Sequence, residues 1–175
     1  MGRGIPGGWR RGVVLIALAL TPAVQALPSL GQQLPEFPSR DLRSQPHDSR
    51  ELEGRPTLVV IITDKDAGPA MRAWFDTAQT HVPATVHRAS LITVRAPFFV
   101  SDGAARGRAR KQVPPQYWTD TWMDKNGDMA RRLELPVSRT PYVLALDAEG
   151  RVMASLHAPV SAPESRAIWT ALHGR

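Results

Sequence analysis

The sequence contains no cysteine, and the side chains considered first for chemistry are therefore its carboxylates and histidines. A thiolate is the nucleophile of disulfide exchange and of cysteine peroxidases, and it is a common zinc ligand, so these three chemistries are excluded. No two of the five histidines form the H-x-x-x-H pair of helical metal sites. We therefore expect neither a metal nor another cofactor. The histidines are His47, His81, His87, His157 and His173.

Two carboxylates, Asp64 and Asp66, lie one residue apart between an apolar run and a Gly-Pro pair. Together with Arg139 they are the groups that an enzyme of non-thiol chemistry would use as an acid and base pair. The alternative is a solvated loop in which one carboxylate caps the start of the following helix. The chain shows no nucleophile, metal motif or phosphate loop beside them, so we expect a protein that is not an enzyme.

The elements that must position these residues alternate between strands and helices. A β-branched apolar run at 57–63 predicts a strand buried on both faces. A helix should begin at Gly68, with Pro69 in its first turn, and a pattern typical of a capping box at 161–164 precedes a closing helix. This order predicts an α/β domain whose mixed sheet of four or five strands is covered on both faces. The other strands are expected at 86–94, 118–123, 142–146 and 151–157, and a short helix at 129–135.

The segment from Leu58 to Arg72 resembles the strand, loop and helix start that carry the redox site of thioredoxins. Where that family has Cys-Gly-Pro-Cys, this chain has alanine at both cysteine positions, 67 and 70. Residues 138–144 resemble the family segment that contains a cis-proline, which would be Pro141. The resemblance implies a thioredoxin-like fold without thiol-disulfide activity.

Two further matches narrow the resemblance. Residues 36–57 resemble the opening of exported TlpA-like and redoxin-like members, which implies an N-terminal hairpin extension. The patterns at 122–127 and 147–152 are similar to those of cysteine-free periplasmic members of the YtfJ type.

The resemblance brings the degenerate redox loop and the proline loop to one surface. Backbone N–H groups at a helix start and main-chain groups of a neighbouring loop can receive an extended peptide. We expect a non-catalytic binding or adaptor module for an extracytoplasmic protein or peptide; the alternatives are the non-thiol enzyme and an inert scaffold retained for its shape. The predicted binding residues are Asp66, Ala67, Gly68, Pro69, Ala70, Arg139, Thr140, Pro141 and Tyr142.

Residues 1–26 have the pattern of a secretory signal. Three arginines within the first eleven residues precede the apolar run Val13 to Leu20, and Val24-Gln25-Ala26 is a small-x-small cleavage site. The run is shorter than the ~20 residues that span a bilayer. We expect cleavage after Ala26, a periplasmic or secreted domain at 27–175 and no transmembrane segment after cleavage; the alternative is a signal kept as an anchor.

The net charge of +6 depends partly on the signal. Removing residues 1–26 takes away three arginines and no acid from the 22 basic and 16 acidic side chains, so the net charge falls to +3. That balance is typical of a solvated surface, and we expect no nucleic-acid partner. The segment 96–115 has no clear period and is expected to be an insertion, partly helical or mobile. Its basic run Arg106 to Lys111 is expected to be solvated, with contact to anionic lipid or a partner as the alternative.

Overall fold

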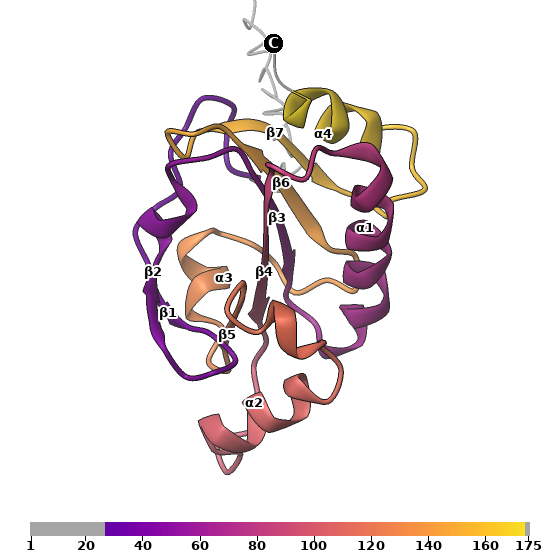
Figure 1. Ribbon diagram of the computed structural model, residues 1–175. Helices are drawn as coiled ribbons and strands as arrows, with labels where there is room; N and C mark the ends of the chain where they lie inside the picture. The colour runs from indigo at the N-terminus through magenta and orange to yellow at the C-terminus, as the bar shows by residue number, and fades with distance from the viewer. Residues whose placement is uncertain (1–26, 174–175) are drawn as a thin grey trace, which may run out of the picture.

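The structure, a computed structural model, describes residues 27–173, and the predicted signal sequence lies outside this range. A five-stranded sheet forms the centre, in the order β5-β4-β3-β6-β7, and a separate two-stranded hairpin lies beside it (Figure 1). The strands are β1 (Pro38–Arg40), β2 (Pro46–Asp48), β3 (Thr57–Ile62), β4 (His87–Thr93), β5 (Thr121–Asp124), β6 (Tyr142–Leu146) and β7 (Val152–His157). The α-helices are α1 (Gly68–His81), α2 (Asp102–Arg110), α3 (Asp128–Arg132) and α4 (Ser165–Leu172).

The sheet is mixed. β3 pairs in parallel with β4 and antiparallel with β6, β4 pairs in parallel with β5, and β6 pairs antiparallel with β7. All six residues of β3 are buried, as the β-branched run predicts for a central strand. The predicted α/β architecture with an N-terminal hairpin is confirmed.

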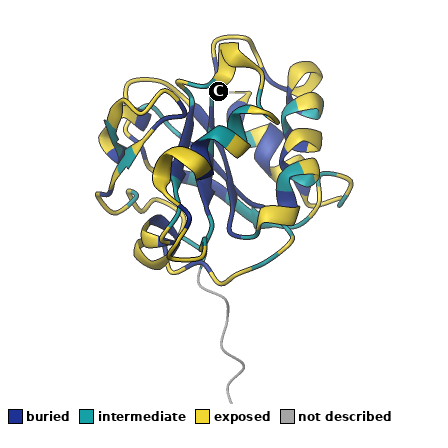
Figure 2. Ribbon diagram, turned by 90° about the horizontal axis from the view of Figure 1, so that it is seen from below, coloured by how far each residue is buried: buried dark blue, intermediate teal, exposed yellow. Residues whose placement is uncertain are grey.

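Side-chain alternation along β3 supplies two cores, one on each face of the sheet. Leu58, Val60 and Ile62 belong to the cluster that packs under α1 and α4, while Val59 and Ile61 belong to the cluster under α3 and the hairpin. Figure 2 shows the result, with dark-blue strands in the middle and exposed residues on the outer faces of the helices.

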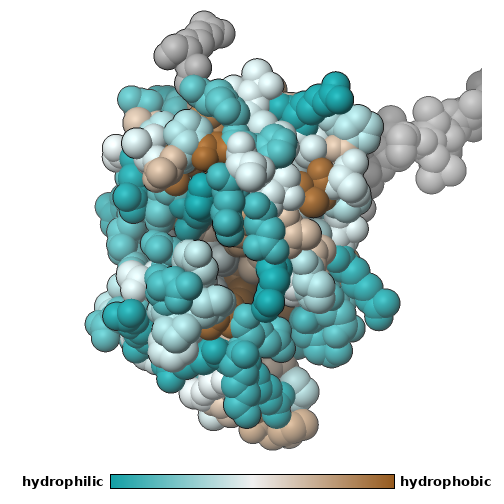
Figure 3. Space-filling model, turned by 45° about the vertical axis from the view of Figure 1, so that its right-hand side comes forward, coloured by the Kyte–Doolittle hydropathy of each residue, from teal (hydrophilic) through white to brown (hydrophobic). Residues whose placement is uncertain are grey.

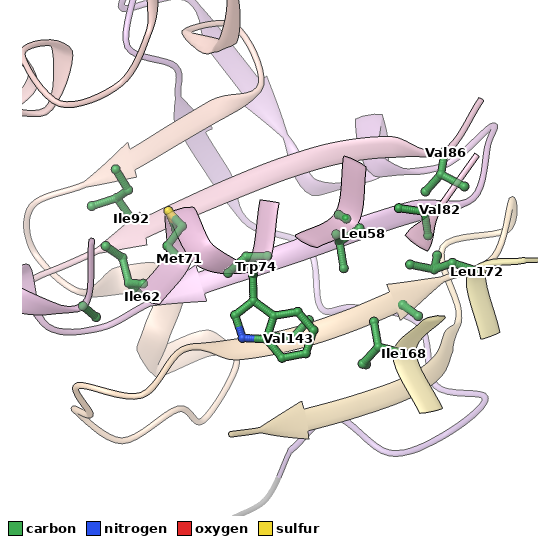
Figure 4. Packing of buried hydrophobic residues seen from close by; sticks show 14 of the residues in the cluster. Leu58, Ile62, Met71, Trp74, Val82, Val86, Ile92, Val143, Ile168 and Leu172 are labelled. Atoms are coloured by element: carbon green, nitrogen blue, oxygen red, sulfur yellow. The ribbon is translucent and has the colours of Figure 1, made fainter. Parts of the chain in front are cut away.

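Helix α1 forms because its sequence gives it a helix-compatible start and one apolar face. Pro69 lies in the first turn, where its missing N–H costs nothing. Met71, Trp74 and Ala78, spaced three and four apart, are buried against the sheet. Figure 4 shows the indole of Trp74 projecting from α1 into the middle of the cluster, close to Val143 of β6.

The insertion contains a helix, in agreement with the expectation of a partly helical segment. The expectation that its basic run is solvated holds for Arg108 and Lys111 but was wrong for Arg106 and Arg110, which are buried and partly buried. Arg106 is 8% exposed, and the guanidinium of Arg110 donates from Nε to the carbonyl oxygen of Leu42 and lies 5.4 Å from the ring centre of Trp118. The apolar stems of arginines can cover hydrophobic surface while the charge stays near polar partners. These contacts fix α2 to the domain.

A partly buried cluster of charged side chains lies where the hairpin meets β5. The carboxylate of Asp41 is completely buried, and its Oδ2 lies 3.4 Å from Nε2 of His47. On the other side of the ring, Nδ1 of His47 contacts Oε2 of Glu51 at 2.7 Å. The imidazole stacks on Trp122 of β5, with ring centres 5.0 Å apart. The hairpin therefore docks through a histidine between two carboxylates.

This cluster makes the stability of the domain depend on pH. Burial by itself would lower the pKa of His47, but the hydrogen bonds and charges of Glu51 and Asp41 together outweigh it and raise that pKa above 6.5. Burial would raise the pKa of Glu51, but the hydrogen bonds from His47 and from the Asp48 N–H outweigh it and lower that pKa below 4.5. Between pH 4.5 and pH 6.5, therefore, both side chains are charged in the folded protein.

We therefore expect the His47 contribution to be complete below pH 6.5 and to be lost as pH rises through the folded pKa. The Glu51 contribution should be complete above pH 4.5 and be lost as pH falls through its folded pKa. Urea denaturation between pH 4 and 9 checks this. The variant His47→Gln should lose most of the decline on the alkaline side; an identical pH profile in the variant would contradict the assignment.

Candidate functional site

Asp64 caps the turn that precedes α1. Its carboxylate accepts a hydrogen bond of 2.8 Å from the N–H of Asp66 and so caps the short 3₁₀ turn Lys65–Ala67 that leads into α1. The backbone N–H of Ala67 bonds to the carbonyl oxygen of Asp64 at 3.2 Å. Asp64 thus has the capping role that the sequence offered as an alternative to catalysis.

The hydroxyl of Thr63 holds the proline loop beside this helix start. Its Oγ1 accepts from the N–H of Ser138 at 2.8 Å and donates to the carbonyl oxygen of Pro136 at 3.0 Å. Thr63 is buried at the end of β3. One side chain therefore connects the two segments that the sequence placed on a common surface.

A Ser-His contact that no sequence pattern predicts supports the same loop. Oγ of Ser138 lies 2.9 Å from Nε2 of His157 and also accepts from the N–H of Thr140 at 3.0 Å. The imidazole stacks on Tyr142, with ring centres 4.0 Å apart, because the two residues are register partners on β7 and β6. The phenol of Tyr142 donates to the carbonyl oxygen of Pro136 at 3.0 Å. Nineteen positions separate Ser138 from His157, so only the strand register could have revealed the contact.

The predicted binding residues differ in access. Asp66, Pro69 and Arg139 are exposed, and Gly68, Ala70 and Thr140 are partly exposed. The other three are buried, so their side chains cannot meet a partner; they are Ala67, Pro141 and Tyr142.

The prediction of a cis bond at Pro141 was wrong, since no peptide bond among residues 27–173 is cis. The trans form is favoured by about 0.5–1 kcal/mol at X-Pro bonds unless the surroundings impose the other isomer. Here the loop is held in place by the Thr63 and Ser138 hydrogen bonds instead.

The exposed part of the site carries an acid between two bases. Oδ1 of Asp66 is 2.8 Å from Nζ of Lys65, and Oδ2 is 3.7 Å from a guanidinium nitrogen of Arg139. The hydrogen bond and charge of Lys65, and then the charge of Arg139, lower the pKa of Asp66. A carboxylate whose pKa is lowered is a weak general base at neutral pH, which disfavours the non-thiol enzyme.

The insertion borders the site, which no sequence pattern predicts. A guanidinium nitrogen of Arg72 donates to the carbonyl oxygen of Gln112 at 2.8 Å, and a Cβ added at Gly68 would meet Oε1 of Gln112 at 3.5 Å. The chain after α2 therefore lies against the first turns of α1. Any ligand at Gly68 would also meet this part of the insertion.

An open groove of about 850 Å³ lies elsewhere, between the end of α1 and the start of α4. His81, Trp169 and His173 are among its lining residues, and it is separated from Gly68 by the length of α1 (Figure 1). In residues 27–173, no group of three or more histidine, aspartate and glutamate side chains is arranged so that it could hold a metal ion. Within the same range, every helix is too short or too polar to cross a membrane.

We expect the variant Thr63→Val to lower the free energy of unfolding by about 2 kcal/mol, because the N–H of Ser138 loses its acceptor in a partly buried place. Urea denaturation gives the energy, and amide exchange at Ser138 should become faster. Thr80→Val is the matched control, since that exposed hydroxyl bonds only within its own helix turn and with its neighbour His81. Equal losses in the two variants would contradict the role assigned to Thr63.

Comparison with solved structures identifies the fold as thioredoxin-like. The peroxidoxin BcpB of Mycobacterium tuberculosis superposes with a TM-score of 0.56 at 16% identity, over 85% of this chain and 99% of that one. A secreted disulfide oxidoreductase of M. tuberculosis, homologous to DsbE of E. coli, superposes with a TM-score of 0.53 at 18% identity, over 78% of this chain and 93% of that one. An exposed lipoprotein thioredoxin of Streptococcus pneumoniae superposes with a TM-score of 0.53 at 10% identity, over 78% of this chain and 98% of that one. No family model and no curated protein matches the chain.

These similarities show that the chain has a thioredoxin-like fold, the fold of several solved peroxidoxins and disulfide oxidoreductases. The chain has no cysteine, so this fold carries no thiol chemistry here. At identities below 20% the likeness concerns the fold alone.

Proposed function

We propose that this protein is an exported, non-redox binding module that engages an extracytoplasmic polypeptide through the surface of Asp66, Gly68, Pro69, Ala70, Arg139 and Thr140. The observation that carries the proposal is the double hydrogen bond of the buried Thr63 hydroxyl, which keeps the proline loop against the start of α1. The surface is held in place by hydrogen bonds and contains no cysteine. It can therefore bind a partner but cannot exchange a disulfide with it.

The charges of the site favour a polypeptide partner. Arg139 has 80% of its side chain exposed and only a long contact to Asp66, so its guanidinium is available to main-chain carbonyls or carboxylates. Pro69 and Ala70 add small apolar surface beside it. Export is supported by the signal-like pattern of residues 1–26 and by two similar structures described as secreted and as an exposed lipoprotein.

The test is capture of extracytoplasmic proteins on the immobilised chain, with identification by mass spectrometry. The variant Gly68→Arg/Arg139→Glu fills the surface and reverses its charge. A Cβ at Gly68 meets its nearest neighbour at 3.5 Å, an ordinary contact, and circular dichroism checks that the variant is folded. The matched control is Arg55→Glu/Arg151→Glu, at two exposed arginines outside the site.

A partner held by the wild type and by the control, and lost by the site variant, is the expected result. Capture that is equal for all three proteins would refute the site. No reproducible capture by any of them would refute the binding module and favour the inert scaffold.

A further inference from the structure

Two neighbouring phenylalanines at the beginning of the insertion have almost no contact with the rest of the domain. Phe98 is 95% exposed and Phe99 is 75% exposed. Their rings meet edge to face, with centres 5.6 Å apart and an angle of 81° between the planes. Adjacent exposed aromatic rings are a costly surface in water, and such apolar surface commonly marks a binding site.

The rings are carried by a loop that is anchored at both ends. Val100 is 7% exposed and belongs to the core cluster under α1, and its N–H bonds to the carbonyl oxygen of Pro97 at 2.9 Å. Ser101 then caps α2 by accepting from the N–H of Ala104 at 3.2 Å. The loop therefore presents Phe98 and Phe99 in a fixed place.

Basic side chains lie on both sides of this pair in the sequence. The segment 95–113 contains five basic side chains and one acid, Asp102, whose carboxylate lies 3.8 Å from Nζ of Lys125. Arg95, Arg108 and Lys111 are exposed. Arg108 and Lys111 are three positions apart at the end of α2, so they lie on the same side of it.

The segment forms one end of the molecule. In Figure 1, α2 lies at the opposite end from α4 and extends below the sheet. Figure 3 shows tan, apolar atoms beside strongly hydrophilic ones at this lower end. A protruding tip can reach a flat surface without hindrance from the rest of the domain.

We infer that this tip, residues 95–111, docks on an anionic lipid surface. Phe98 and Phe99 enter the boundary between headgroups and acyl chains, while Arg95, Arg108 and Lys111 contact lipid phosphates. Aromatic rings next to basic side chains are the combination that binds the membrane interface. A lipid surface fits better than a protein pocket, because the charged side chains of the tip are nearly all positive and the rings protrude from a convex end.

The test is co-sedimentation of the full chain with vesicles of phosphatidylglycerol and phosphatidylcholine in equal parts, and with vesicles of phosphatidylcholine alone. Binding should be strong for the mixed vesicles, weak for the neutral ones and reduced by salt. Phe98→Ala and Phe99→Ala should each lower the partition coefficient about tenfold. Arg108→Gln and Lys111→Gln should each lower it about fivefold.

Two controls keep the result specific. Leu30→Ala removes another exposed apolar side chain, and Arg55→Gln/Arg151→Gln removes exposed charge outside the tip; neither should change partitioning. Absence of binding to the mixed vesicles would overturn the inference, and so would binding that the two phenylalanine variants leave unchanged. Self-association or capture of a protein that depends on Phe98 and Phe99, without vesicle binding, would assign the tip to a protein partner instead.

Discussion

Trp74→Ala should lower the free energy of unfolding by about 3–5 kcal/mol, the range typical of an aromatic ring removed from a closed core. The indole is completely buried, its centre lies 5.1 Å from that of Trp169 on α4, and its Nε1 donates to the carbonyl oxygen of Ala158 at 3.3 Å. The substitution leaves a cavity between α1 and the sheet. Because domains of this size have about 5–15 kcal/mol in total, much of the stability should be lost.

Urea denaturation followed by far-ultraviolet circular dichroism measures this loss without relying on tryptophan fluorescence. Trp118→Ala is the matched control, because Trp118 is only partly buried and packs on Arg110 in the insertion. It should cost about 1–2 kcal/mol. A loss at Trp118 that equals or exceeds the loss at Trp74 would contradict the assignment of the core.

Asp41→Ala should lower the free energy of unfolding by about 2–4 kcal/mol. Oδ1 of Asp41 accepts from the N–H groups of Arg43 and Gln45, both at 2.8 Å, and the carboxylate faces the His47 ring. The substitution leaves two backbone donors without their acceptor and the partly buried His47 with only one of its two carboxylate partners. The hairpin should therefore detach from β5 more readily, which amide exchange in residues 38–48 would detect.

Asp41→Asn separates the two contributions. Its amide oxygen can still accept from both backbone donors, whereas the charge that faces His47 is lost. We expect about half of the cost of Asp41→Ala, together with a weaker pH dependence above pH 6.5. Equal losses for the two variants would mean that the backbone hydrogen bonds contribute nothing.

The regular elements could be predicted because local pattern and tertiary position agree there. The apolar run at 57–63 became β3, and the spacing of Met71, Trp74 and Ala78 fixed the buried face of α1. The adjacency of the redox loop and the proline loop also followed from the resemblance, and the ion pair between Asp66 and Arg139 places them together.

What could not be predicted depends on contacts between distant residues. Arg110 and Leu42 are 68 positions apart, so the sequence could not show that the basic run is held against the domain. The prediction of a capping box at 161–164 was wrong, since α4 begins at Ser165 without a side-chain cap. Backbone turns after Pro159 supply the acceptors for the N–H groups of Ala162 and Ser165 instead. The Ser138 and His157 pair required the strand register.

The most direct test of the central claim, that a cysteine-free thioredoxin surface binds a polypeptide, is site-specific photo-crosslinking in the source cells. A photoreactive amino acid is placed at Ala70, partly exposed at the site, and in a second protein at Ala84, exposed beyond the other end of α1. We expect a discrete crosslinked partner from position 70, lost with Arg139→Glu, and none from position 84. The same products from both positions, or none from position 70, would contradict the proposed function.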